Sequence, residues 1–264
     1  MKLGFIGCGN MAKAIMGGII RSGIVSAADI IAAAAHAKTL EAAEKSLGIH
    51  TTLQNAEVVR RSETIFLAVK PQYYEEVIRG IADEAGEGKL FITIAPGKTL
   101  EWLENAFGGS VHLVRAMPNT PAMVGEGMTA ACPNRYVTKD EKERTLTLLS
   151  AFGKTELVPE SLMDAVVSVS GSSPAFVFMM IEAMADAAVA DGIPRAQAYT
   201  FAAQAVLGSA KMVLETGRHP AELKDMVCSP AGTTIEAVRV LEEKGFRSSI
   251  IEAMRACTKK AKSL

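Results

Sequence analysis

The chain has 264 residues, with 28 Lys and Arg against 29 Asp and Glu and a formal net charge of −1. A balance this even provides no electrostatic field for nucleic acid or for an anionic membrane surface. Aromatic residues make up 5% of the chain, too few to suggest a platform for stacking bases. The four cysteines are isolated and show no metal-ligand spacing. We therefore expect no nucleic-acid, membrane or metal partner.

A glycine-rich turn follows directly on a short apolar run, Leu3–Ile6, at the start of the chain. The turn, Gly7-Cys8-Gly9-Asn10-Met11-Ala12, has the spacing G-x-G-x-x-A between an expected strand and an expected helix, as in dinucleotide-binding folds. Gly7 suits the tight turn and Gly9 lets a pyrophosphate reach the backbone. Ala12 stays small where the helix crosses the strand. The pattern predicts a dinucleotide site.

No part of the sequence resembles a secretory signal or a membrane span. The glycine turn interrupts the N-terminal region before the apolar run of a signal could form. The most apolar long stretch, Ala175–Ala190, is short for a span and contains Glu182 and Asp186. These two acids are four residues apart, so we expect them to mark the wet face of a buried helix. We expect a soluble, cytoplasmic protein.

The second apolar run, Ile30–Ala35, indicates which dinucleotide is used. NAD sites usually carry a carboxylate at the end of this strand, but Asp29 lies before the run. The far end offers His36 and Lys38, two bases that could pair with a 2′-phosphate. The pattern favours NADP, although both residues could equally be solvated positions in the first turn of a helix.

Strand and helix patterns alternate to about residue 157, and helical patterns alone follow. The further expected strands are Thr64–Val69, Leu90–Ile94, Val111–Arg115 and Met128–Ala131, continuous apolar runs of the kind buried on both faces of a parallel sheet. The later expected helices are Pro174–Ala190, Arg195–Thr216, Ala221–Val227, Thr233–Lys244 and Phe246–Lys262, separated by Gly and Pro breaks.

The resulting prediction is an α/β fold with two domains. Residues 1–159 would form an N-terminal Rossmann-type doubly wound sheet that binds the dinucleotide, and residues 160–264 a C-terminal all-helical domain. A helical half of this size carries more apolar surface than it can bury alone. We therefore expect a homodimer through the helical domain, or a larger homo-oligomer.

The segment Ser229-Pro230-Ala231-Gly232-Thr233-Thr234 is expected to turn from a loop into a helix. Ser229 suits the N-cap and Pro230 the first helical position. Such a start offers unpaired N–H groups and the positive end of the helix dipole, and Gly232 permits close approach of a ligand. Thr233 and Thr234 add hydroxyl donors. The arrangement suits a small carboxylate, although an ordinary capped helix would carry the same signals.

Three rigid loops follow expected strands, at the edge where ligands of a doubly wound sheet bind. They are Ala68-Val69-Lys70-Pro71, Ala95-Pro96-Gly97 and Arg115-Ala116-Met117-Pro118-Asn119-Thr120-Pro121. Lys70 could face a phosphate or a carboxylate, and Asn119 and Thr120 could bond a carboxamide or a ribose hydroxyl. Each loop could also be a simple connector.

Five segments, in this order along nearly the whole chain, resemble the pyrroline-5-carboxylate reductase family. They are Gly4–Ala12, Ala68–Pro71, Arg115–Pro121, Ser170–Ala175 and Leu223–Ile235. The chain departs from the family pattern at Ser173, where Gly is frequent, and at Phe176, where Tyr is frequent. The end of the second strand also lacks the Ser or Arg that many members place near a 2′-phosphate.

The resemblance implies a reaction and a set of site residues. The reaction is hydride transfer from NADPH, with NADH as a possible substitute, to the C=N bond of 1-pyrroline-5-carboxylate, giving L-proline. Gly232, Thr233 and Thr234 would hold the small-molecule substrate. The residues implied to bind the cofactor are Gly7, Gly9, Asn10, Met11, Ala12, His36, Asn55, Ala68, Val69, Lys70, Pro71, Pro118 and Asn119.

A protonated imine already carries the positive charge that makes it a hydride acceptor, so the chemistry does not require a strong general acid. Catalysis would rest on positioning and electrostatics. Thr234 is the best hydroxyl for bonding the ring nitrogen and Ser172 is a second catalytic candidate. Ser172 could instead belong to a cap of the helix near Pro174.

Two other functions share features with this sequence. A β-hydroxyacid dehydrogenase would share the glycine turn and a helical second domain, but the helix expected at Pro174–Ala190 lacks the lysine that those enzymes use. A nucleotide sensor without turnover would not need the Gly232–Thr234 segment. Both are less consistent with the sequence than the reductase.

Overall fold

The computed structural model describes residues 2–86 and 88–263 and divides into two compact units. The first unit is Met1–Ser172 together with Cys257–Leu264, and the second is Ser173–Ala256. The expected boundary between residues 159 and 160 concerns the functions of the two parts and stays a prediction.

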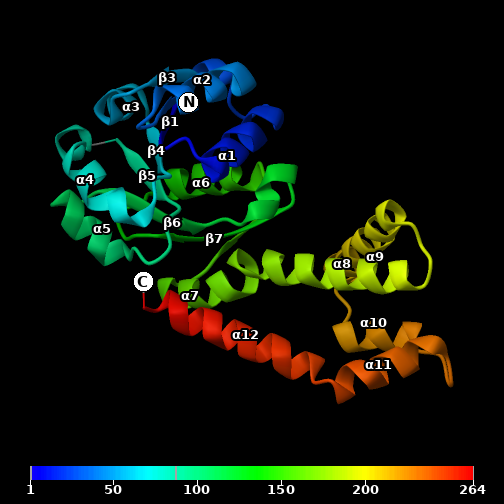
Figure 1. Cartoon of the computed structure of the whole chain (residues 1–264). Coiled ribbons are helices and arrows are strands. Elements are labelled where there is room, and N and C mark those ends of the chain that lie inside the picture. Colours follow the sequence, from blue (N-terminus) through cyan, green and yellow to red (C-terminus); the bar gives the residue numbers. More distant parts are fainter. Residues whose placement is uncertain (1, 87, 264) are drawn as a thin grey trace. The chain divides into compact units, whose positions relative to one another are not determined.

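An eight-stranded sheet forms the centre of the first unit (Figure 1). Its strands are β1 (Leu3–Ile6), β2 (Ile30–Ala33), β3 (His50–Thr52), β4 (Thr64–Leu67), β5 (Leu90–Thr93), β6 (His112–Met117), β7 (Gly127–Pro133) and β8 (Gly153–Leu157). Their order across the sheet is β3-β2-β1-β4-β5-β6-β7-β8. Strands β1 to β6 are parallel, with β1 pairing both β2 and β4. The Rossmann-type doubly wound sheet is confirmed.

The run at residues 128–131 forms part of β7, but its direction differs from the expectation of a parallel sheet. β7 runs antiparallel to β6, with Ala116 opposite Ala131, and β8 then pairs parallel with β7. The connection between β6 and β7 holds only the short 3-10 turn Thr120–Val124. A parallel crossover needs a dozen or more residues, usually with a helix, so this connection is too short for one.

Helices cover both faces of the sheet, and alternate residues along each strand point to opposite faces. The helices that surround the sheet are α1 (Asn10–Arg21), α2 (Ala37–Leu47), α3 (Asn55–Arg61), α4 (Tyr74–Arg79), α5 (Leu100–Phe107) and α6 (Lys139–Ser150). One core joins α1, α2 and α6 to side chains such as Phe5 and Phe66, whose rings stack 4.6 Å apart. The other core joins α3, α4 and α5 to side chains such as Ile65 and Leu67. Both faces are therefore buried, as the continuous apolar runs predicted.

Arg115 anchors the segment after β8 to the sheet. This β6 side chain is 3% exposed and pairs with Glu160 at 3.0 Å and with Asp164 at 3.7 Å. Glu160 also accepts a hydrogen bond from Leu100 N, at the start of α5, at 2.7 Å. A buried guanidinium needs such partners because desolvation of an unpaired charge is costly. The ion pairs fix the start of α7 (Met163–Val166) on the first unit.

The second unit is helical, as expected. It contains α8 (Ser173–Ala190), α9 (Arg195–Thr216), α10 (Pro220–Val227), α11 (Thr233–Glu243) and most of α12 (Phe246–Ala261). Glycines with positive φ stand at its breaks, Gly192, Gly217 and Gly245, where the left-handed conformation ends a helix at no steric cost. The expected helix bounds are confirmed to within a residue.

The second unit leaves most of its large apolar side chains exposed. Within the described part of α8 and α9, the buried residues are the alanines Ala185, Ala198 and Ala202. Phe178, Met179 and Phe201 are each at least 60% exposed. The expectation that α8 is a buried helix is therefore wrong for the single chain. Contiguous apolar surface of this kind marks an interaction site.

One helical stretch, Glu160–Ala190, is long and apolar enough by length and composition to cross a membrane. The sequence suggested a shorter apolar helix beginning near residue 174. The stretch is longer because α7 and a π-turn, Val167–Gly171, run continuously into α8. Length and composition are weak evidence, since helices of other proteins meet the same test. The expectation of no membrane partner stays a prediction.

Candidate active site

The glycine turn lies where the chain path across the sheet reverses. From β1 the chain proceeds outward to β2 and β3, then crosses back to β4 on the other side of β1. In doubly wound sheets, ligands bind outside the carboxyl ends of the strands at this switch point. Gly7 has φ +102°, and its N–H donates to Ala33 O at 2.9 Å. A Cβ on Gly7 would lie 2.6 Å from the backbone of Ala68. The turn therefore requires glycine at position 7.

Gly9 has a different reason to be glycine. It is the N-cap of α1 with φ −78°, a conformation open to any residue, and no atom lies within 4 Å of where its Cβ would be. The open space lies beside the first N–H groups of α1, whose N-cap has no side chain to bond them. Ala12 is 1% exposed and Met11 packs against the core, while Asn10 is exposed. This is a cradle in which a diphosphate can reach the backbone.

The loops after β4 and β5 are held together by a side chain that the sequence did not single out. Tyr74 is 1% exposed, and its hydroxyl donates to Leu67 O at 2.6 Å and lies 2.8 Å from Thr93 Oγ1. Burial raises the pKa of Tyr74, so its hydroxyl stays protonated and can donate. Ala68 N in turn donates to Ile6 O at 2.8 Å. The loop at Ala68–Pro71 is therefore fixed against the glycine turn.

The expected cofactor residues of that loop differ in exposure. Ala68, Val69 and Pro71 are half-buried and Lys70 is exposed. Lys70 precedes the 3-10 turn Pro71–Tyr73, with Pro71 in its first position. The backbone there is rigid, and the lysine side chain is accessible to an anion.

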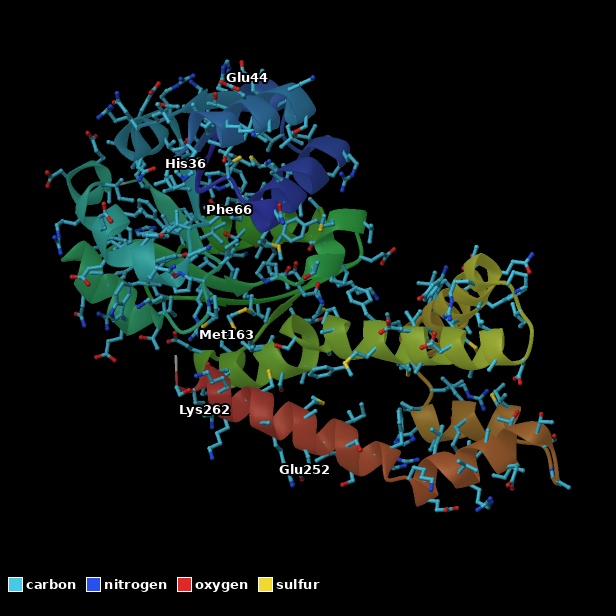
Figure 2. All side chains as sticks on the ribbon, in the orientation of Figure 1. His36, Glu44, Phe66, Met163, Glu252 and Lys262 are labelled. Atoms are coloured by element: carbon cyan, nitrogen blue, oxygen red, sulfur yellow. The ribbon has the colours of Figure 1, made fainter. Side chains whose placement is uncertain are left out.

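His36 and Asn55 occupy the next two strand ends. His36 is the exposed N-cap of α2, two residues beyond Ala34 (Figure 2). Asn55 is the first residue of α3, which follows β3. Both lie after the carboxyl ends of parallel strands, as an adenosine site requires. Asp29 lies before β2, so it is at the opposite end of the strand from His36 and cannot serve as the carboxylate of an NAD site.

Asn119 and Pro118 follow β6, and both are buried. The Asn119 amide donates to Ser170 O at 2.9 Å and accepts from Met128 N at 2.8 Å. These two bonds join the end of β6, the start of β7 and the π-turn. The pairing with Ser170 joins residues 51 positions apart, which sequence spacing does not predict.

Ser172 lies at the end of the π-turn. Its N–H donates to Val167 O at 2.8 Å, and its Oγ accepts from the Cys257 thiol at 3.2 Å. Because α8 begins at Ser173, Ser172 also stands directly before a helix, and the alternative that it belongs to the cap of that helix stays a prediction. Cys257 had been treated as an isolated cysteine, since residues 85 positions apart carry no local signal.

The predicted substrate segment begins α11, but with a different cap from the one expected. Ser229 is not the N-cap: the turn Ser229–Gly232 is closed by Gly232 N donating to Ser229 O at 3.1 Å, and the helix starts at Thr233. Pro230 and Ala231 are the two central residues of this turn, and Ala231 has φ +57°. Pro followed by a positive φ is typical of a type II turn, which competes with helix at these positions.

This geometry strengthens the case for an anion site. Gly232 is the N-cap and has no side chain to bond the first-turn N–H groups. Thr233 and Thr234 occupy the first two positions of an 11-residue helix and are exposed and half-buried. Ala231 is the one non-glycine residue with positive φ in the described part of the chain. Such strain clusters at ligand sites.

The two sets of predicted residues belong to different units. The expected cofactor residues and Ser172 lie in the first unit, and Gly232, Thr233 and Thr234 lie in the second. The two catalytic candidates, Thr234 and Ser172, are therefore in different units.

Pyrroline-5-carboxylate reductase from Escherichia coli is 53% identical over 263 residues, covering 100% of this chain and 98% of that protein. The chain belongs to the pyrroline-5-carboxylate reductase family. The enzyme of that name from Methanosarcina acetivorans is 46% identical, covering 100% and 97%. Residues 160–264 match the family described as pyrroline-5-carboxylate reductase dimerisation, and residues 2–97 that described as NADP oxidoreductase, coenzyme F420-dependent.

Solved structures of the family have the same fold. The pyrroline-5-carboxylate reductase of Coxiella burnetii has a TM-score of 0.92 at 34% identity, covering 99% of this chain and 97% of that one. The pyrroline carboxylate reductase of Plasmodium falciparum, solved with NADP bound, has a TM-score of 0.91 at 30% identity, covering 100% and 97%.

Proposed function

We infer that the protein is a pyrroline-5-carboxylate reductase, which reduces the C=N bond of 1-pyrroline-5-carboxylate to give L-proline. The observation that carries this inference is the similarity to reductases of this name along the whole chain, in both units. It agrees with the resemblance deduced from the five sequence segments.

The first unit fits NADP. The cradle at Gly7 and Gly9 leaves backbone N–H groups open to a diphosphate, and Ala68 to Pro71 form a rigid wall beside it. His36 and Asn55 are at the strand ends where the adenosine ribose and its phosphate would lie. Bound NADPH supplies the hydride. NADH remains a possible substitute, because His36 and Lys38 are both exposed and the strand end lacks the Ser or Arg that many family members place near a 2′-phosphate.

The second unit fits the substrate carboxylate. The first-turn N–H groups of α11 lie at the positive end of the helix dipole, and Thr233 and Thr234 occupy the first two positions of that helix. The turn itself favours glycine at position 232, because a Cβ there would crowd Ser229 Oγ. Thr234 would bond the ring nitrogen and so orient the imine carbon for attack. Ser172, in the first unit, is the second catalytic candidate.

The chain's contribution to catalysis is therefore binding and orientation. A protonated cyclic imine is already electrophilic, and the residues of the proposed site include no group that must act as a strong acid. The hydroxyls hold the ring and the helix dipole balances the carboxylate charge.

A homo-oligomer follows from the dimerisation family that residues 160–264 match. The finer proposal is a homodimer through α8 and α9, where Phe178, Met179 and Phe201 are exposed. Burial of these side chains against a second copy would complete a core that the single chain lacks. A cytoplasmic location and the absence of a nucleic-acid partner remain predictions from the sequence.

The test is NADPH oxidation, followed by absorbance, with pyrroline-5-carboxylate and chemical identification of the product. Proline formed in proportion to NADPH consumed supports the proposal. A folded protein that binds NADPH but gives no proline with either nucleotide would refute it.

A further inference from the structure

The segment that leads out of the first unit is a π-turn, Val167–Gly171, closed by the bond from Ser172 N to Val167 O. π-turns are rare overall, and those that occur often lie at functional sites. The first unit ends at Ser172. The position of a proposed substrate contact thus depends directly on how this turn is held.

Asn119 holds the turn from the sheet. Its side chain is buried, with one amide hydrogen committed to Ser170 O and its carbonyl oxygen committed to Met128 N. One amide therefore connects the end of β6, β7 and the turn. A side chain fixed on two sides is suited to hold a backbone in place, and only one of its hydrogens remains for any ligand.

The last turns of α12 hold the same segment through other residues. The Cys257 thiol donates to Ser172 Oγ at 3.2 Å, and Thr258 Oγ1 donates to Ser168 Oγ at 3.0 Å. Cys257 is the first residue of the chain's return to the first unit. Both contacts come from α12 and join it to the π-turn and to Ser172.

We propose that Asn119 is a positioning residue for the reductase reaction: its amide fixes Ser170 and thereby sets the position of Ser172, the catalytic candidate of the first unit. This inference rests on the proposed function. It changes the role expected for Asn119 from the sequence, in which the side chain bonds the cofactor. The two roles differ in what they predict, since a cofactor ligand governs NADPH affinity and a positioning residue governs the use of the imine.

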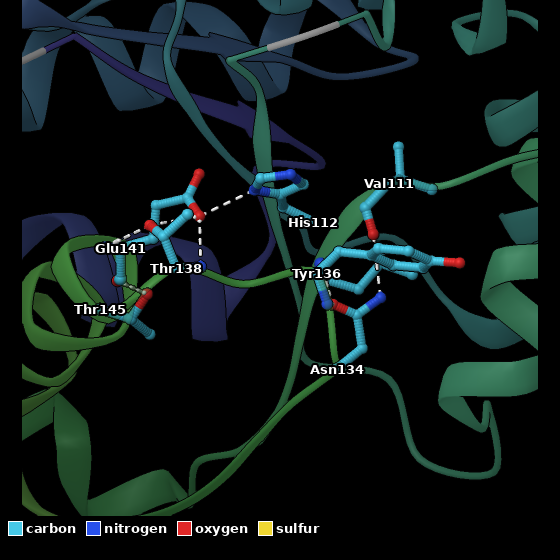
Figure 3. A network of polar contacts seen from close by, with 8 residues as sticks. Val111, His112, Asn134, Tyr136, Thr138, Glu141 and Thr145 are labelled. Atoms are coloured by element: carbon cyan, nitrogen blue, oxygen red, sulfur yellow. Dashed lines mark hydrogen bonds and ion pairs between the residues drawn. The ribbon is translucent and has the colours of Figure 1, made fainter.

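Asn134 offers a matched control (Figure 3). It is 8% exposed, as Asn119 is, and its amide also makes bonds along β6, accepting from Leu113 N at 3.2 Å and donating to Val111 O at 2.9 Å. These bonds are at the amino end of β6, away from the strand ends that carry the proposed site. Loss of either amide leaves buried backbone groups unpaired, so both variants should lose stability.

The experiment compares Asn119→Ala with Asn134→Ala by thermal unfolding, NADPH titration and steady-state kinetics. For Asn119→Ala we expect kcat/KM for pyrroline-5-carboxylate to fall about tenfold or more while the NADPH Kd stays within about twofold. For Asn134→Ala we expect a fall in Tm at least as large, because this side chain also donates to Glu104 and accepts from Tyr136 N, with both constants within about twofold of the wild type.

Two further variants keep the test decisive if Asn119→Ala folds poorly. Asn119→Asp retains the acceptor for Met128 N but loses the donor to Ser170 O, and should show the same kinetic pattern. In a Ser172→Ala background, the further change Asn119→Ala should lower kcat/KM little more, because both changes act through Ser172.

The outcomes separate cleanly. A rise in the NADPH Kd equal to the loss in kcat/KM would make Asn119 a cofactor ligand and overturn the inference. Equal kinetic losses in Asn134→Ala, or fully additive losses with Ser172→Ala, would also overturn it. A wild-type protein that binds NADPH but does not reduce pyrroline-5-carboxylate would instead refute the proposed function on which the inference rests.

Discussion

The two glycines of the N-terminal turn should respond in opposite ways to the same substitution. Gly7→Ala places a methyl group 2.6 Å from the Ala68 carbonyl and 2.8 Å from Val69 N, at φ +102°. Gly9→Ala places one in open space at φ −78°. One glycine serves the fold and the other leaves room for the ligand.

The magnitudes follow from those geometries. An alanine at positive φ costs about 1–2 kcal/mol. Crowding that forces the backbone to move adds about 1–3 kcal/mol, so Gly7→Ala should lower the free energy of unfolding by about 2–5 kcal/mol. Gly9→Ala should leave that free energy unchanged or raise it by about 0.4–1 kcal/mol, because alanine restricts the unfolded chain. Its added methyl should nevertheless raise the NADPH Kd by about tenfold or more, which is about 1.4 kcal/mol.

Urea unfolding and NADPH titration of both variants provide the assay. Gly9→Ala should weaken NADPH binding without lowering the free energy of unfolding. Wild-type NADPH affinity in Gly9→Ala, or wild-type stability in Gly7→Ala, would show that the assigned roles of these glycines are wrong.

Three other changes are predicted. Thr234→Ala should lower kcat/KM for the imine by about tenfold with Tm unchanged, and a smaller effect than about twofold would remove this hydroxyl from the mechanism. Ala231→Gly relieves the strain at φ +57° and should raise the free energy of unfolding by about 1 kcal/mol, whereas a loss in urea unfolding would contradict the turn assignment. Glu141 lies in a buried network where burial raises its pKa, but bonds from Thr138 and His112 bring the net pKa below the ordinary 4.5 (Figure 3). A lowered folded pKa contributes stability that is present above the unfolded value and lost as pH falls through the folded one. Glu141→Gln should therefore cost about 1.5–3 kcal/mol near pH 7 by urea unfolding, with the gap closing as the pH falls below about 4.5, and a gap independent of pH would refute the role of its charge.

The fold could be predicted largely because its signals are local. Buried strands such as β4 and β5 are continuous apolar runs, and the helix breaks of the second unit are Gly and Pro clusters. Strands β3 and β8 lie at the two edges of the sheet and carry exposed and half-buried residues, so they give no apolar run. The direction of β7 depends on the length of a connection rather than on composition.

In the candidate site, too, features with a local sequence signal could be predicted and those without one could not. The cradle at Gly7 and Gly9 has a spacing signature, and the structure supplies the steric reason for each glycine. The N-cap of α11 was misplaced at Ser229 because a Ser-Pro pair suits both a helix start and a turn, and the bond from Gly232 N to Ser229 O selects the turn. The link between Asn119 and Ser170 joins residues 51 positions apart and leaves no trace in sequence spacing.

The most direct test of the function is the rate of NADPH oxidation with pyrroline-5-carboxylate, measured beside the same reaction with NADH. We expect proline to form in step with nucleotide oxidation, and faster with NADPH than with NADH. A protein that binds NADPH but forms no proline would contradict the assignment, and a clear preference for NADH would contradict the role given to His36.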